Sequence, residues 1–97
     1  MSNTPIQSVN KFGTKFYRTN GKLHRENGPA IEYTDGSKEW YVNGNLHRKD
    51  GPACEYTDGD TYWFIDDHRL SEAEFNAYKS SYLNTPVSNE GEEHEYL

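Results

Sequence analysis

Short runs rich in aromatic and other apolar residues, set between polar turn dipeptides, recur along the chain. Residues 39–42 (EWYV) and 53–56 (ACEY) are rich in the aromatic and small apolar residues that fit a half-buried strand. Asn-Gly and Asp-Gly pairs separate such runs, and these pairs are typical of tight turns because they adopt positive φ at low cost. The pattern therefore predicts short antiparallel strands joined by hairpins.

This pattern repeats with a period of 23 residues. Residues 20–36 read NGKLHRENGPAIEYTDG and residues 43–59 read NGNLHRKDGPACEYTDG, with thirteen of the seventeen positions identical. A third unit begins at residue 59 and loses the pattern after residue 65. Tandem units of this length bury apolar surface mainly against their sequence neighbours, so we expect a repetitive hairpin sheet. The same spacing relates Tyr17, Trp40 and Trp63.

After residue 70 the pattern changes from strand to helix. Ser71 and Glu74 have the spacing of a capping box, which marks the start of a helix. Phe75, Tyr78 and Tyr82 follow at the spacing of one helical stripe. Because so short a helix is marginal alone, we expect it to dock on the last hairpin and cover that end of the sheet.

These elements divide the chain into four segments. The fold class predicted is mainly β, an antiparallel meander of 23-residue β-hairpin repeats capped by one short C-terminal α-helix, α+β overall. The first hairpin has no helix over its outer edge, and unprotected edges invite pairing, so we expect a homodimer through residues 6–18. The segments are an N-terminal segment or half-repeat strand (1–11), the repeats (12–70), the capping helix (71–83) and an acidic flexible tail (84–97).

Composition and charge narrow the functional classes. The formal net charge of −6 argues against direct binding to nucleic acid or to a membrane surface, since both need a positive patch. The chain shows no signal-peptide pattern and no membrane-spanning apolar stretch. A single cysteine, Cys54, excludes an internal disulfide, and it replaces Ile31 of the previous unit, so we interpret it as a buried apolar residue. We expect a cytoplasmic protein with no metal or other cofactor.

The repeat unit resembles the MORN repeat. Both have a period near 23 residues, an aromatic residue before an Asn-Gly turn and a tyrosine before an Asp-Gly turn. The likeness is closer to a MORN-like variant with the signature Asn-Gly-x-Leu-His-Arg-x-Asp-Gly-Pro-Ala, matched here at residues 43–53, which occurs in small proteins of tailed bacteriophages and giant viruses. The resemblance covers residues 12–78 and implies an elongated hairpin sheet that acts as a scaffold and binding surface.

The repeated His-Arg pairs are the first candidate site. His24-Arg25 and His47-Arg48 occupy equivalent positions, where the histidines could bind a metal or the arginines a phosphate or carboxylate. The favoured interpretation is a repeated packing role. In that role each histidine bonds a backbone carbonyl, and each arginine pairs with a glutamate of its unit or stacks on an aromatic ring.

Aromatic ladders are the second candidate site. Tyr17, Trp40 and Trp63 predict one ladder, and Tyr33 with Tyr56 a second. If the helix covers one ladder, the other is left as a contact surface, and Trp, Tyr and Arg are the residues enriched in binding hot spots. The predicted partner-binding residues are Tyr17, Trp40, Tyr41, Trp63, Arg25, Arg48, His24 and His47.

The sequence carries no nucleophile elbow, phosphate-binding loop or zinc-protease motif, so we expect no enzymatic activity. We predict a non-catalytic protein-binding module, and the resemblance implies a phage-encoded inhibitor or adaptor that occludes a host protein, such as a defence-system component, in the host cytoplasm. Three alternatives stay open. One is a sponge for a nucleotide signal, using Arg25, Arg48 and the aromatic residues, and another is a structural protein of a virion or scaffold. The third, a DNA mimic that uses its carboxylates, is the weakest because the chain before residue 84 has a net charge of only −2.

Overall fold

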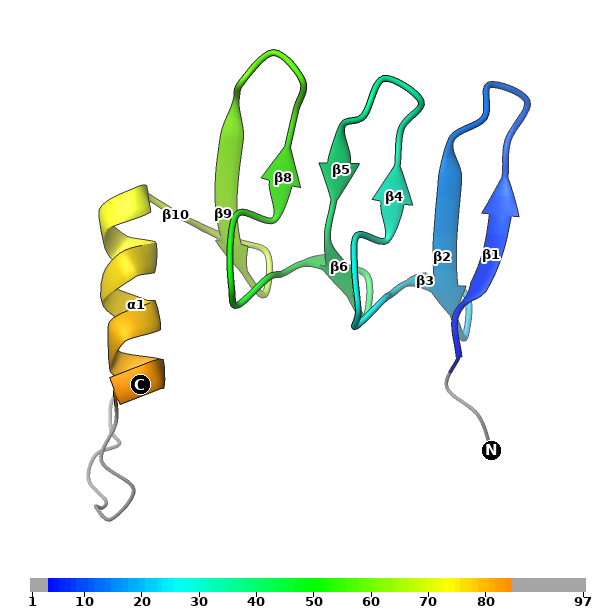
Figure 1. The fold of residues 1–97 in the computed structure, drawn as a ribbon. Helices are drawn as coiled ribbons and strands as arrows, with labels where there is room; N and C mark the ends of the chain where they lie inside the picture. The colour runs from blue at the N-terminus through cyan, green and yellow to red at the C-terminus, as the bar shows by residue number, and fades with distance from the viewer. Residues whose placement is uncertain (1–3, 85–97) are drawn as a thin grey trace.

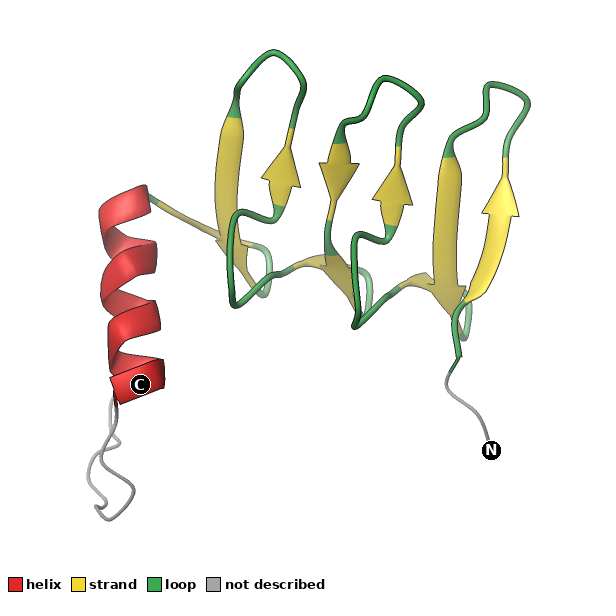
Figure 2. Cartoon of the chain, in the orientation of Figure 1, coloured by secondary structure: helices red, strands yellow, loops and turns green. Residues whose placement is uncertain are grey.

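The computed structural model describes residues 4–84, which form ten short strands and one helix joined by turns and loops (Figures 1 and 2). Eight strands form one antiparallel sheet in the order β1-β2-β4-β5-β8-β9-β10, with β3 paired to β2, and β6 with β7 forms a separate hairpin. The predicted fold class is confirmed. Of the predicted acidic tail, residues 84–97, Asn84 is the last residue of the helix, and residues 85–97 lie outside the described residues. The elements are β1 (Ile6–Val9), β2 (Lys15–Thr19), β3 (Lys22–Leu23), β4 (Ile31–Glu32), β5 (Lys38–Glu39), β6 (Tyr41–Val42), β7 (Asn45–Leu46), β8 (Cys54–Glu55), β9 (Thr61–Ile65), β10 (His68–Leu70) and α1 (Glu72–Asn84).

Left-handed backbone at the turn dipeptides closes the hairpins. Asn43 and Gly44 have φ of 53° and 84°, so both central positions of the β6–β7 turn are positive, as a type I′ turn requires. In the third unit Asp66 and Asp67 take the same conformation, with φ of 49° and 68°. The turn geometry of the repeat therefore persists where the Asn-Gly dipeptide has been lost.

The strand register separates two faces of one sheet. Residues directly opposite each other share a face, and successive residues of a strand alternate between faces. One row runs from Lys15 to Glu32, Lys38 and Glu55, so its charges alternate in sign across the sheet. The neighbouring row lies on the other face and comprises Phe16, Ile31, Glu39, Cys54 and Tyr62.

The core is thin because the sheet is a single layer, 17 Å across its smallest dimension. Ala30 and Ala53 are fully buried within it, and their carbonyls accept the N–H groups of Tyr17 and Trp40, respectively. Cys54 is buried as predicted, and burial raises the pKa of its thiol. The buried apolar side chains of the described sheet are therefore few: Ala30, Ile31, Ala53 and Cys54.

Helix α1 closes one end of the sheet. It begins with the predicted capping box, in which the Ser71 N–H donates to Glu74 Oε1 at 2.7 Å and the Glu74 N–H donates to Ser71 Oγ at 3.0 Å. Phe75, only 2% exposed, lies against Trp63 with ring centroids 6.4 Å apart. Within residues 4–84, no helix is both long enough and apolar enough to cross a membrane.

Candidate binding surfaces

Each signature arginine lies over the aromatic residue of its own unit. The Arg48 guanidinium carbon is 3.8 Å from the centroid of the Trp40 ring, a close cation–π contact. Arg48 Nη1 also donates to the Pro52 carbonyl and to the Glu55 carboxylate, both at 3.0 Å. The first unit repeats this arrangement with Arg25, Tyr17, Pro29 and Glu32.

A glycine completes the arginine site from the other side. A Cβ atom added at Gly51 would lie 2.9 Å from Arg48 Cζ, and one at Gly28 would lie 3.3 Å from Arg25 Cζ. The guanidinium therefore lies between an aromatic ring and a glycine backbone, which explains why glycine precedes proline in the signature. We call this side of the sheet, with Tyr17, Trp40, Trp63, Arg25 and Arg48, the stacking face.

The third unit has no arginine for its aromatic residue. Position 71, which lies 23 residues after Arg48, is Ser71, the N-cap of α1. Phe75 from the helix lies against Trp63 instead. The helix thus supplies the contact that arginine supplies in the earlier units, and the array ends there.

The two signature histidines join successive units. His24 Nδ1 accepts the N–H of Asn43 at 3.0 Å, and His47 Nδ1 accepts the N–H of Asp66 at the same distance. The expected bond to a carbonyl was therefore wrong: the partner is an amide of the turn in the next unit, which can only donate. This bond occupies Nδ1, and residues 4–84 contain no group of three or more metal-ligating side chains around either ring.

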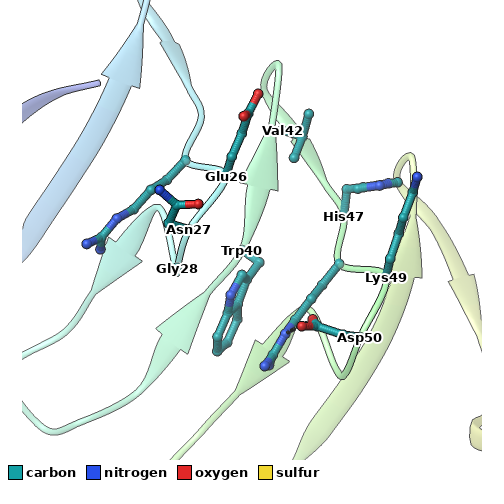
Figure 3. A pocket seen from close by; sticks show the side chains of 10 residues that line it. Glu26, Asn27, Gly28, Trp40, Val42, His47, Lys49 and Asp50 are labelled. Atoms are coloured by element: carbon teal, nitrogen blue, oxygen red, sulfur yellow. Dashed lines mark hydrogen bonds and ion pairs between the residues drawn. The ribbon is translucent and has the colours of Figure 1, made fainter. Parts of the chain in front are cut away.

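A groove lies between the first two signature loops. It has a volume of about 820 Å³, and Figure 3 shows Trp40 between the segment of Glu26 and Gly28 on one side and that of Lys49 and Asp50 on the other. A smaller groove of about 500 Å³ occupies the equivalent place one unit earlier, beside Tyr17. The groove residues at positions 26, 27, 49 and 50 are among those that differ between the units.

The opposite side of the sheet is an aromatic surface, which we call the tyrosine face. Arg18 lies over the Phe16 ring at 5.1 Å at one end, and Arg69 lies over the Tyr62 ring at 4.4 Å at the other. All six rings of this face are half-buried, because no second layer covers this side of the described sheet. The tyrosine face comprises Phe16, Tyr33, Tyr41, Tyr56, Tyr62 and Phe64, with Arg18 and Arg69.

One carboxylate lies at the centre of the tyrosine face. The Tyr41 hydroxyl donates to Glu39 Oε1 at 3.0 Å, and the Tyr56 hydroxyl donates to Glu39 Oε2 at 2.6 Å. Burial first, and the nearby Glu39 carboxylate next, raise the pKa of Tyr41, Tyr56 and Tyr33 above the usual tyrosine range. These hydroxyls therefore remain protonated donors, which holds their rings in place.

The structure distributes the predicted site residues over three places. Five lie on the stacking face, and His24 and His47 lie between units. Tyr41 alone lies on the tyrosine face, beside the second ladder of Tyr33 and Tyr56. The sequence reasoning missed the rest of this face, although strict two-residue alternation from Trp40 would have indicated it. The missed residues are Phe16, Arg18, Tyr62, Phe64 and Arg69.

Comparison with protein-family models, with curated proteins and with solved structures found no match to this chain. The likeness to MORN repeats therefore depends on the signature residues alone.

Proposed function

We propose that the chain is a non-catalytic protein-binding module whose tyrosine face contacts the partner. This proposal depends on one observation, which is how far equivalent positions of successive units are alike on each face of the sheet. On the stacking face, equivalent positions keep their chemistry, as in Tyr17, Trp40 and Trp63. On the tyrosine face Tyr33 recurs as Tyr56, but two other positions change: the equivalents of Glu39 are Phe16 and Tyr62, and the equivalents of Tyr41 are Arg18 and Phe64.

Packing within the units explains why stacking-face residues recur, and contact with a partner explains why residues of the tyrosine face vary. The first two units each use an aromatic ring, an arginine and a glycine for their own packing, so these residues recur. A surface that binds one partner meets different atoms along its length, so its residues need not recur. The positions that vary are therefore those that packing within the repeat does not constrain.

The chemistry of the tyrosine face suits a protein partner. Tyrosine and arginine are enriched among interface residues that contribute most to affinity. Because Glu39 already orients Tyr41 and Tyr56, binding costs little of their side-chain entropy. In the viral setting that the MORN-like resemblance implies, the partner is a host protein, and covering its working surface makes the chain an inhibitor or adaptor.

The groove beside Trp40 supports a second candidate, a nucleotide ligand, because it combines an indole ring with Arg25 and Arg48. Both arginines, however, already donate to the carboxylates of Glu32 and Glu55. That pairing leaves little positive charge for a phosphate, so the observations favour protein binding. A thermal-shift panel of nucleotides tests this candidate, and an unchanged melting curve excludes it.

Affinity capture from a lysate of the host cell tests the main proposal. The bait is the full chain, beside a tyrosine-face variant, Tyr33→Ala with Arg69→Ala, and a stacking-face control, Lys38→Ala. We expect one stoichiometric protein that the wild type and the control retain and the tyrosine-face variant loses, with all three baits folded by circular dichroism. A partner that the tyrosine-face variant retains contradicts the assignment of this face, and a folded wild type that retains no protein contradicts protein binding itself.

A further inference from the structure

Charge is divided unevenly along the chain and therefore along the sheet. Residues 1–25 contain five Lys and Arg and no Asp or Glu, whereas all sixteen acidic residues lie in residues 26–97. Among the side chains of residues 4–81, no ion pair involves the first four of those cations. These exposed cations are Lys11, Lys15, Arg18 and Lys22, all in the hairpins around β2.

Exposed apolar side chains gather at the same end of the sheet. Ile6 is 74% exposed, Val9 57% and Phe12 71%, and all three belong to β1 or the turn that follows it. They are the large apolar residues that the described part of the chain leaves open to solvent. A binding partner could bury these apolar side chains and place its own negative charges beside the exposed cations.

The backbone of β1 is also open for pairing. β1 is the outermost strand of the sheet, and the Tyr17 N–H on its neighbour β2 donates away from β1, to Ala30. Tyr17 lies opposite Gln7, and in an antiparallel ladder both members of such a pair turn their peptide groups outward. The peptide groups of Gln7 and, two residues on, Val9 therefore face the unpaired edge.

We propose that this edge binds, as an added strand, the acidic C-terminal segment of a second copy of the chain, residues 85–97. That segment carries Glu90, Glu92, Glu93 and Glu95 and no Lys or Arg, so it complements the cations beside β1. Strand addition to an open edge gains main-chain hydrogen bonds, and flanking side chains supply the specificity.

Charge also selects head-to-tail association over the symmetric dimer first expected through residues 6–18. Pairing two β1 edges brings the four exposed cations of each copy together, which costs free energy. The acidic segment follows α1, and Figure 1 shows α1 and β1 at opposite ends of the sheet. A second copy can offer its segment without the chain crossing its own sheet. The contact is heterologous, so association continues beyond dimers.

Sedimentation velocity of the full chain at increasing concentration and low salt tests this proposal. We expect species larger than dimers, which dissociate as salt rises because the contact is electrostatic at its rim. The edge variant Lys15→Gln with Arg18→Gln weakens association about tenfold. The tail variant Glu92→Gln, Glu93→Gln and Glu95→Gln weakens it comparably. Lys38→Gln with Lys79→Gln changes net charge as the edge variant does and leaves association unchanged.

A second pair of variants tests strand pairing apart from charge. Val9→Pro removes an outward N–H that β2 does not use, whereas Val9→Thr keeps it. We expect Val9→Pro to abolish association and Val9→Thr to preserve it. A chain that stays monomeric, association that survives the tail variant, or association that survives Val9→Pro each overturns the proposal. Arg18 is the one tyrosine-face residue among these cations, and no variant here changes Tyr33 or Arg69, so these outcomes are distinguishable from those of the capture experiment.

Discussion

On the stacking face, every ring of the aromatic ladder is covered by a side chain of the same chain, Arg25, Arg48 or Phe75. On the tyrosine face, arginines lie over the rings at the two ends, Phe16 and Tyr62, while Tyr41 and Tyr56 direct their hydroxyls to one shared carboxylate, Glu39. Both faces are aromatic, and both belong to a sheet one layer thick. The difference teaches that aromatic content alone does not identify a binding surface: what matters is whether each ring already has its partner.

The covered rings also explain why an arginine takes a packing position that an apolar residue would normally occupy. Stacking on Trp40, a carbonyl acceptor at Pro52 and the carboxylate of Glu55 satisfy Arg48 on several sides. A single-layer sheet has no room for a conventional aliphatic core, so the long side chain of arginine covers aromatic surface while its charge is neutralised.

The largest expected effect comes from uncovering the last ring of the ladder. Phe75→Ala removes the buried side chain that lies on Trp63, and we expect a loss of about 3–5 kcal/mol in the free energy of unfolding, enough to unfold a domain of this size. Phe75→Leu keeps most of the apolar volume and should cost far less. Urea titration followed by circular dichroism measures both. Equal stability of the two variants contradicts the role assigned to Phe75.

The second prediction concerns the glycine beneath each arginine. Gly51→Ala places a Cβ atom 2.9 Å from Arg48 Cζ and should cost about 1–3 kcal/mol, while Gly28→Ala, at 3.3 Å from Arg25 Cζ, should cost less. Thermal unfolding of the two variants gives the order. In the double variant with Arg48→Ala the cost of Gly51→Ala should largely vanish, and purely additive costs would refute the shared site.

Alkaline pH should weaken the tyrosine face. The pKa of Tyr41 and Tyr56 is raised in the folded chain, while in the unfolded chain both titrate near pH ~10. Above that pH the unfolded state loses protons that the folded state retains, so the stability present below pH ~10 declines as pH rises. Urea titrations at successive pH values measure this decline. Tyr41→Phe with Tyr56→Phe should make it shallower, and an unchanged slope would contradict the assignment.

The smallest effect is expected at the charged row of the stacking face. Lys38 is exposed and lies opposite both Glu32 and Glu55, so Lys38→Ala should change the free energy of unfolding by no more than about 0.5 kcal/mol. Chemical denaturation measures the change. A loss of several kcal/mol would show that the alternating charges, rather than the covered rings, stabilise this face.

Much of the fold was predictable because its signals are local. The turn at Asn43-Gly44 and the capping box at Ser71 each depend on residues that are neighbours in the sequence or on backbone preference alone. The packing role of Arg48 was also predictable, since only a ring or a carboxylate within its unit could satisfy a repeated arginine. The division of charge between residues 1–25 and 26–97 was readable in the same way but was missed.

The sequence by itself determined the period, the turns, the helix cap and the residues that each unit brings to its own packing. Only the tertiary structure decided that His24 accepts an amide 19 residues further on, that Tyr41 and Tyr56 share the Glu39 carboxylate, and that Phe75 takes the place of an arginine. The physical reason is distance along the chain. Propensity and capping act between near neighbours, whereas the partner of a side chain on a sheet depends on register, and register is set only when all the strands have paired.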